Sequence, residues 1–304
     1  MIGLTRKVEK VEQMLADTQQ PATGRSLTAD AFRRLRANKM AVFSIWLLAL
    51  IVLMAFVGPL LIENGYEKPD WSYMRHPPTM DNGHYFGTDQ NGRDMMARTF
   101  YGTRISLAVA LVATLVSVVI GVMYGAIAGY FGGRIDAIMM RFVDVMYAFP
   151  YILIVILLMV IFGRNVILLF VGIGMIEWLT MARIVRGQTL SLKEKEFVEA
   201  ARAAGQGPFK IIIKHIVPNL LGTVVIYATL TIPEIIVTES FLSYLGFGVQ
   251  EPLTSLGTLI SEGSKVLEVL PWLLIFPAIV LVSLLLSLSY IGDGLRDAFD
   301  PKDR

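Results

Sequence analysis

The sequence predicts an all-α membrane protein with six transmembrane helices and both termini in the cytoplasm, and three observations lead to this prediction. Hydrophobic residues make up 55% of the 304 residues and charged residues only 17%, with a mean hydropathy of +0.60. A soluble domain usually carries about a quarter charged residues, so too little polar surface exists here to cover a globule. Six apolar stretches are long enough to cross a bilayer, and lysine and arginine gather in alternate connections between them.

The six expected spans follow from the need for about 20 apolar residues per crossing. The first is the clearest, because only Ser44 and the Gly58-Pro59 pair interrupt it. In chain order the spans cover residues 40–62, 105–130, 138–162, 166–184, 220–245 and 270–291. The expected organisation is a leader (1–39), a transmembrane domain (40–291) with an external loop (63–104) and a cytoplasmic loop (187–218), and a tail (292–304).

The leader carries two apolar stripes at helical spacing. The first, Leu4, Val8, Val11 and Leu15, fits either a short amphipathic helix or a solvated, flexible segment. The second places Leu27, Ala31, Phe32 and Leu35 beside Arg33, Arg34, Arg36 and Lys39, a pattern that suits a helix on an anionic inner leaflet. The leader is not expected to be a cleavable signal peptide, because charges recur throughout it and no apolar core follows within it.

The distribution of basic residues predicts the orientation. The basic residues that precede the first span place the leader in the cytoplasm, and six spans return the tail to the same side. The loop 187–218 and its flank are cytoplasmic by the same rule, since they hold Arg183, Arg186, Lys193, Lys195, Arg202, Lys210 and Lys214. In the external loop, the basic residues are matched by Glu63, Glu67, Asp70, Asp81, Asp89 and Asp94.

Three glycines lie four residues apart in the second span. Gly121, Gly125 and Gly129 share one face of a helix, where the absence of side chains lets another helix approach closely. We therefore expect a packing role for this face in preference to a pore-lining role.

The cytoplasmic loop is predicted to form two short helices that are separated at a glycine. The alanines after Glu196 favour helix, Gly205 is a natural stop, and Pro208 can open the next helix. Pro218 marks the entry to the fifth span. The small apolar face formed by Ala200, Ala201 and Ala204 suits a groove on another protein, although an ordinary interfacial helix fits the spacing as well.

The same loop resembles the EAA loop of bacterial ABC importer permeases. Glu199-Ala200-Ala201 is followed after three residues by Gly205, and after nine more by His215-Ile216-Val217-Pro218. His215 stands where that pattern usually has isoleucine and Val217 where it has leucine; a histidine there resembles the peptide-permease branch. The resemblance implies a coupling helix seated in a cleft of an ATPase subunit. The residues that would transmit its motion are Glu199, Ala200, Ala201 and Gly205, with His215 and Pro218 completing the motif.

A second block lies in the external loop, where glycines and short polar side chains are typical of turns. It reads His84, Gly87, Thr88, Asp89, Gly92, Arg93 and Asp94, followed by Arg98. This block resembles the external motif of the dipeptide and oligopeptide permease family, of the OppC/DppC type. Two interpretations stay open: a structural loop that caps the second span, or a contact with the peptide-binding receptor or a partner permease.

The resemblance extends over nearly the whole chain, and its implications reach beyond the residues themselves. It implies a type I ABC importer permease fold in the bacterial inner membrane. It also implies a second, OppB-like permease, two OppD/OppF-like ATPase subunits and an OppA-like periplasmic peptide-binding protein. ATP and Mg would be bound by the ATPases, and this chain would need no cofactor.

Four acidic residues fall within the spans, where ionisable groups face the bundle interior or water. They are Asp144, Glu177, Glu234 and Glu239. Arg141 is spaced to pair with Asp144. Glu177 and Glu234 are candidates for the translocation path, Glu234 because it follows the potential kink at Pro233; a satisfied structural role is the alternative for each.

Several chemistries have no support in the sequence. No G-x-x-x-x-G-K-[ST] motif is present to hold ATP, no G-x-S-x-G element occurs, and cysteine is absent. The three histidines lack metal-ligand spacing, and no basic block indicates nucleic acid binding. Other classes to weigh are an ion-coupled carrier with Glu177 or Glu234 as proton site, a membrane hydrolase using Ser240 and Glu239, and a scaffold or receptor.

Overall fold

A computed structural model describes residues 27–62 and 65–299 of the chain, and in that part the regular structure is helical apart from one isolated bridge between Thr88 and Asp94. The first apolar stripe of the leader lies outside the described residues. The elements before the third span are α2 (Leu27–Ala37), α3 (Lys39–Leu61), the 3₁₀ turn η1 (Trp71–Tyr73) and α4 (Met95–Phe131). They are followed by α5 (Gly133–Ala148), α6 (Tyr151–Phe162), α7 (Val166–Leu192), α8 (Glu196–Ala203), α9 (Pro208–Ile211), the π-helical turn η2 (Ile212–Ile216), α10 (Val217–Tyr244), α11 (Leu256–Ser264) and α12 (Trp272–Phe299).

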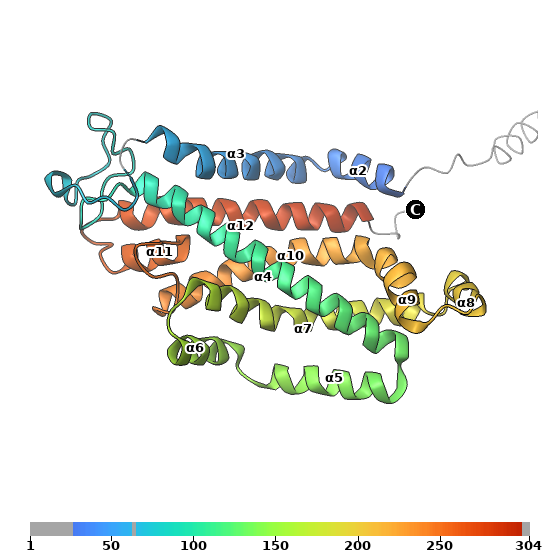
Figure 1. Ribbon diagram of the computed structural model, residues 1–304. Helices are drawn as coiled ribbons and strands as arrows, with labels where there is room; N and C mark the ends of the chain where they lie inside the picture. The colour runs from blue at the N-terminus through green and yellow to red at the C-terminus, as the bar shows by residue number, and fades with distance from the viewer. Residues whose placement is uncertain (1–26, 63–64, 300–304) are drawn as a thin grey trace, which may run out of the picture.

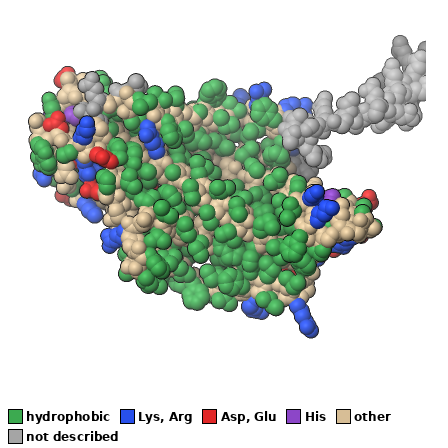
Figure 2. All heavy atoms as spheres, viewed as in Figure 1, with side chains coloured by type: hydrophobic (Ala, Val, Ile, Leu, Met, Phe, Trp, Pro, Cys, Tyr) green, Lys and Arg blue, Asp and Glu red, His purple; other side chains and the backbone are tan. Residues whose placement is uncertain are grey.

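The long helices run in roughly the same direction, with α4 crossing the bundle obliquely (Figure 1). α2, α8 and the end of α12 lie at one end of the bundle, whereas the segment before α4 and α11 lie at the other (Figure 1). Hydrophobic side chains cover the middle of the visible face, and charged side chains gather towards its two ends (Figure 2). This banding is what a bilayer-spanning protein requires, because charged groups avoid the hydrocarbon core.

Five helices are long and apolar enough to cross a membrane, and a sixth span is obtained if the bent pair α5 and α6 counts as one. The prediction of a continuous third span is wrong, because α5 and α6 meet at 77°. Pro150 lies at the break, and Phe149 before it has extended dihedrals (φ −83°, ψ 137°). Proline disfavours the helical conformation of the preceding residue and donates no backbone hydrogen bond.

Two spans begin earlier than predicted. α4 starts at Met95 because the Asp94 carboxylate accepts a hydrogen bond from the Ala97 amide at 2.7 Å, which caps the helix. The fifth span forms one continuous helix, Pro208–Tyr244, through α9, η2 and α10. Pro218 lies inside it, and the π-helical turn just before that residue accommodates the missing N–H.

The second stripe of the leader forms helix α2, as predicted. Asn38 separates it from α3 by accepting a hydrogen bond from the Ala41 amide at 3.1 Å. α2 packs on the last turns of α12, where a Cβ added to Gly294 would meet the Ala41 Cβ at 2.6 Å and Leu35 Cδ1 at 3.2 Å.

The packing role predicted for the three glycines is confirmed. Helices α4 and α7 form the most extensive helix pair in the described chain. A Cβ at Gly121 would lie 2.6 Å from the Met181 Cβ, and one at Gly129 would lie 2.7 Å from the Thr189 Cβ. Both distances are too short for real atoms, so only glycine permits this approach.

Candidate functional site

The residues singled out in the sequence lie in three places: the α8–α9 unit at one end of the bundle, the motif 84–94, which is predicted to be external, at the other, and acidic residues between them. α8 is an eight-residue helix with Glu196 and Glu199 in its first turn, where carboxylates favour the helix dipole. Gly205 ends it with φ +74°. The Gly205 amide donates to the Arg202 carbonyl at 2.9 Å, and the Gln206 amide to the Ala201 carbonyl at 3.1 Å.

The three alanines of the expected docking face, two in α8 and Ala204 at its C-cap, do not share one surface. Ala201 is buried with Val198 against Ile211, Ile212 and Ile216 of α9 and η2. Ala200 and Ala204 are exposed, as is Glu199. The expected docking face is therefore corrected: Ala201 points inward, because positions 198 and 201 are neighbours on the helix surface that packs on the chain's own helices.

His215 and Asn219 link this unit to α10. The Gln206 side-chain oxygen can only accept, so His215 Nε2 donates to it, at 3.0 Å. The Asn219 side-chain amide donates to the His215 carbonyl at 2.6 Å, within the segment where Pro218 interrupts the regular ladder. The loop and the fifth span are thereby joined by side-chain bonds as well as by the backbone.

Ion pairs connect α5 and α7. Arg186 contacts both carboxylate oxygens of Asp136, at 2.5 and 2.6 Å. Arg183 bonds Asp144 at 2.8 Å and stacks on Tyr147. The expected pairing of Asp144 with Arg141 is thus replaced by a pairing between helices, because Asp144 faces α7.

The glycines of the external motif are required by their surroundings. Gly87 and Gly92 have φ of +74° and +77°. A Cβ at Gly92 would overlap the Asp70 carbonyl oxygen, and one at Gly87 would lie 2.8 Å from the His76 carbonyl oxygen. Both the dihedral and the space therefore exclude other residues at these positions.

Thr88 and Asp94 fix the start of α4. Asp94 caps the helix and also accepts a hydrogen bond from His84 Nδ1 at 2.8 Å, with both side chains buried. The Thr88 hydroxyl accepts from the His76 amide at 2.8 Å and donates to the Tyr73 carbonyl. Trp272 of α12 donates its indole N–H to the Thr88 carbonyl at 3.1 Å.

Asp89 is the centre of a buried ion-pair network. Its carboxylate bonds Arg93 Nε at 2.6 Å and Arg98 Nη1 at 2.5 Å. Arg93 continues to Glu251 at 2.8 Å, and Arg98 to Glu262 at 3.1 Å. Burial lowers the pKa of Arg93, but the hydrogen bonds and charges of Asp89 and Glu251 outweigh it and hold that pKa above its ordinary value. These contacts lie within the chain, which favours the structural interpretation of the motif.

The acidic residues within the spans have different environments. Glu239 is fully buried and accepts hydrogen bonds from Ser243 at 2.7 Å and from Ser106 of α4 at 3.2 Å. Glu234 is exposed and Glu177 half-buried. At about 1.5 Å per residue, Glu177 lies about 17 Å from the start of α7 and Glu234 about 15 Å from the end of α10, so the two lie at similar depth.

The geometry does not assemble a hydrolase centre from Ser240 and Glu239. The Glu239 carboxylate accepts its hydrogen bonds from Ser243 and Ser106. The Ser240 hydroxyl has no hydrogen-bond partner within the described residues. Residues 27–62 and 65–299 also contain no group of three or more side chains that could hold a metal ion.

Glu239 connects three elements, which gives a testable consequence. The Ser106 hydroxyl oxygen also accepts a hydrogen bond from the Leu256 amide of α11 at 3.2 Å. Glu239→Leu is expected to lower the free energy of unfolding by on the order of 2 kcal/mol, because two buried hydroxyls lose their acceptor. Glu239→Gln keeps an acceptor of the same shape and should cost less than about 1 kcal/mol. Thermal unfolding of the purified complex measures both, and equal midpoints for the two variants would contradict this account.

Arg104 is a structural residue that the sequence analysis missed. It donates from Nε to the Ala55 carbonyl at 2.5 Å and from Nη2 to the Phe56 carbonyl at 2.8 Å. Pro59 has no N–H for the Ala55 carbonyl, so the guanidinium replaces the lost helix bond. Two features of the sequence could have indicated this contact: Pro59 lies inside one apolar span, and Arg104 directly precedes the start of the next.

Comparisons with known proteins agree with these observations. Residues 121–304 match the family described as binding-protein-dependent transport system inner membrane component, and residues 26–78 match the N-terminal transmembrane domain of oligopeptide transport permease C. The chain is 55% identical over 281 residues to the oligopeptide transport system permease protein OppC of Escherichia coli, covering 92% of this chain and 93% of that protein.

Two further relatives and one solved structure extend the comparison. Identity is 52% over 297 residues to OppC of Haemophilus influenzae, covering 98% of this chain and 95% of that protein. It is 44% over 280 residues to the dipeptide transport system permease protein DppC of Bacillus subtilis, covering 92% and 87%. An inward-facing structure of the MetNI methionine ABC transporter matches with a TM-score of 0.53 and 19% identity over 65% of this chain and 94% of that one, which shows a shared fold.

Proposed function

The chain belongs to the family of binding-protein-dependent transport system inner membrane components, and from this membership we propose that it carries oligopeptides inward across the bacterial inner membrane. It is a multi-pass permease subunit of an ABC transporter. In this proposal it forms half of the pore and pairs with a second, OppB-like permease. An OppA-like periplasmic protein delivers the peptide, and two OppD/OppF-like subunits bind ATP and Mg and hydrolyse the ATP.

The exposed side of α8 is the observation that carries the coupling role. Glu199, Ala200 and Ala204 are open to a partner at the end of the bundle, whereas Val198 and Ala201 anchor the same helix to the chain. Small side chains on the open side let a groove in another protein approach the helix closely. The end that carries α8, together with the leader and the tail, is cytoplasmic in this proposal, and residues 40–291 are the permease domain.

Motion would pass from α8 into the membrane along one continuous helix. The link between His215 and Gln206 ties the α8–α9 turn to a helix that extends from Pro208 to Tyr244. A displacement of α8 by the ATPase would therefore move the outer part of α10, which carries Glu234 and Glu239. Gly205 contributes the left-handed turn that sets the angle between α8 and α9.

Glu177 and Glu234 are proposed to line the translocation path. They lie at similar depth on helices that contact each other, and Glu234 is exposed on the isolated chain. A carboxylate at this depth is costly against lipid, so these side chains are expected to face water or the partner permease.

Cysteine cross-linking tests the coupling role, and the natural absence of cysteine makes the experiment clean. Ala200→Cys is expected to cross-link to a cysteine in the groove of an ATPase subunit in native membranes, with a yield that changes when nucleotide is added. Ala201→Cys is the matched control and should react weakly, because Ala201 is only 5% exposed.

Two outcomes would contradict the proposal. One is a folded Ala200→Cys chain that cross-links to no ATPase with or without nucleotide. The other is peptide uptake driven by a pH gradient alone in vesicles that lack ATPase subunits, which would support an ion-coupled carrier.

A further inference from the structure

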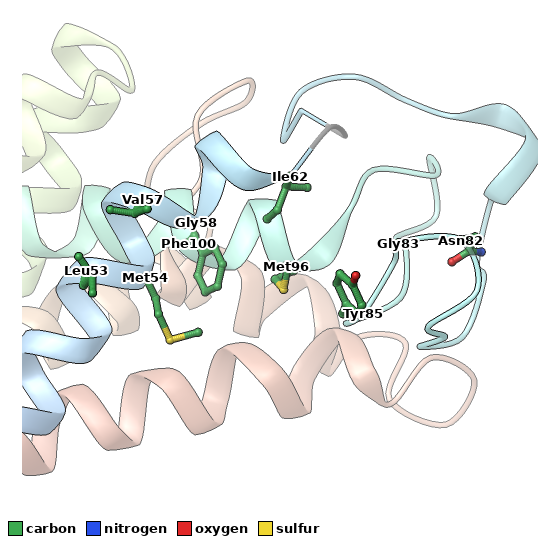
Figure 3. A pocket seen from close by; sticks show the side chains of 10 residues that line it. All are labelled: Leu53, Met54, Val57, Gly58, Ile62, Asn82, Gly83, Tyr85, Met96 and Phe100. Atoms are coloured by element: carbon green, nitrogen blue, oxygen red, sulfur yellow. The ribbon is translucent and has the colours of Figure 1, made fainter.

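A largely apolar cavity of about 630 Å³ lies between α3, the start of α4 and the external segment. Leu53, Met54, Val57 and Gly58 of α3 line it, together with Ile62 just after that helix and Met96 and Phe100 of α4. Figure 3 shows Met54, Phe100, Met96 and Tyr85 along a common space beside α3. Gly58 keeps this space open, since a Cβ there would overlap the ring of Phe100 and displace it.

The cavity is apolar along the helices and polar at its outer end. Asn82, Gly83 and Tyr85, from the segment before α4, close that end, and none of the ten described residues that line the cavity is charged (Figure 3). Asn82 Oδ1 accepts a hydrogen bond from the His84 amide at 3.1 Å. This bond orients the Asn82 side chain and leaves its NH₂ group as a donor. Tyr85 is about half exposed and adds a phenolic hydroxyl to the lining.

The cavity opens onto an exposed apolar surface of the chain. Around it, α3 exposes Leu53, Phe56, Val57 and Leu60. Leu53 is eight residues before the end of α3 at Leu61, so the cavity reaches about 12 Å down the helix. One leaflet of the hydrocarbon core is about 15 Å thick, and the cavity therefore matches the depth of a single leaflet.

The external segment presents the side chains that rest at a membrane interface. Trp71 is 68% exposed and Met80 is 86% exposed, and Tyr85 lies at the mouth of the cavity. Tryptophan and tyrosine favour the level of the lipid headgroups. The polar end of the cavity thus lies where a headgroup would be, and its apolar part lies where an acyl chain would be.

We propose that this cavity binds one phospholipid of the outer leaflet, with an acyl chain between α3 and α4 and its phosphate or glycerol oxygens at Asn82 and Tyr85. The ten described lining residues carry no charge, so none of them supplies a cationic group that would select an anionic headgroup. The flexible side chains of Met54 and Met96 can adapt to the chain. The proposal rests on the membrane location and not on the peptide cargo.

Native mass spectrometry of the whole transport complex tests the proposal. After delipidation in detergent, palmitoyl-oleoyl-phosphatidylethanolamine is added back and the lipid retained per complex is measured. Met54→Trp and Val57→Phe each fill the cavity, and retention is expected to fall about tenfold in the double variant. Leu50→Trp is the matched control, because Leu50 is exposed on α3 outside the lining and its replacement should leave retention unchanged.

A photo-reactive residue at Tyr85 identifies the occupant directly. A phospholipid adduct supports the proposal, whereas an adduct with another protein subunit overturns it. Equal lipid retention in the wild type and in both cavity-filling single variants also overturns it. ATP-driven uptake by the same samples is measured separately, so loss of lipid and loss of transport are distinguishable.

Discussion

Gly125→Leu is expected to prevent the chain from reaching its native fold. A Cβ at this position would overlap the Ala182 carbonyl oxygen and lie 2.9 Å from the Arg186 nitrogen. These are backbone atoms of α7, which cannot move aside as the end of a side chain can. Overpacking a core usually costs about 1–3 kcal/mol, and a clash with the backbone should reach or exceed the upper end of that range.

Fluorescence-detected size-exclusion chromatography of the extracted complex measures this effect as the loss of the monodisperse peak. Gly187→Leu is the matched control, since Gly187 is also helical and no atom lies within 4 Å of a Cβ built there. That control should fold as well as the wild type, or slightly better, because leucine favours helix over glycine. Similar losses for both variants would mean that the α4–α7 contact is not what limits folding.

The glycine pattern shows how far sequence reasoning reaches in this fold. Spacing four apart was enough to predict a close helix contact at Gly121, Gly125 and Gly129. It did not indicate α7 as the partner, because the sequence of α7 meets these glycines with ordinary residues such as Met181 and Thr189. Local periodicity identifies a face, whereas the identity of its neighbour depends on the packing of the whole chain.

The helix boundaries that were predicted wrongly could have been recognised from local sequence features. Pro150 in the third span and the capping residue Asp94 before α4 were both readable from known preferences. Hydropathy outweighed them, because a window of about 20 residues averages over a single proline. The π-helical turn at Ile212–Ile216 has a weaker signal, since Pro218 is compatible with a helix start as well as with a bulge.

The candidate sites divide in the same way. The alanines, Gly205 and Pro208 predicted α8, the turn and the start of the next helix. They did not show that this second helix continues from Pro208 into the fifth span, and they could not separate the inward Ala201 from the outward Ala200. The network around Asp89 was beyond local reasoning, because Arg93 and Arg98 reach Glu251 and Glu262, which are 158 and 164 residues away. Asp144 likewise pairs with Arg183 of α7 and not with Arg141, the partner that sequence spacing suggested.

Asp89→Asn is expected to loosen the whole segment 70–94 before α4. The Arg98 side chain is only 3% exposed, and without the Asp89 charge its remaining partner is Glu262, whose side chain is 35% exposed. Removing one partner of a buried ion pair typically costs about 3–5 kcal/mol, because the other charge stays buried without compensation. Thermal unfolding of the complex and proteolysis between Trp71 and Arg93 measure the loss.

Two further variants distinguish buried from exposed pairing. Glu251→Gln also removes a partner of Arg93, but the Glu251 side chain is 60% exposed, so the expected cost is under about 1 kcal/mol. Asp89→Asn combined with Arg98→Met removes both charges of the Asp89–Arg98 pair and should recover part of the stability, since an uncompensated charge is the main penalty. If Asp89→Asn were as mild as Glu251→Gln while transport was lost, the motif would act by contacting the receptor or the partner permease. A large loss that the double variant partly reverses would instead make the motif the internal clamp that fixes the start of α4.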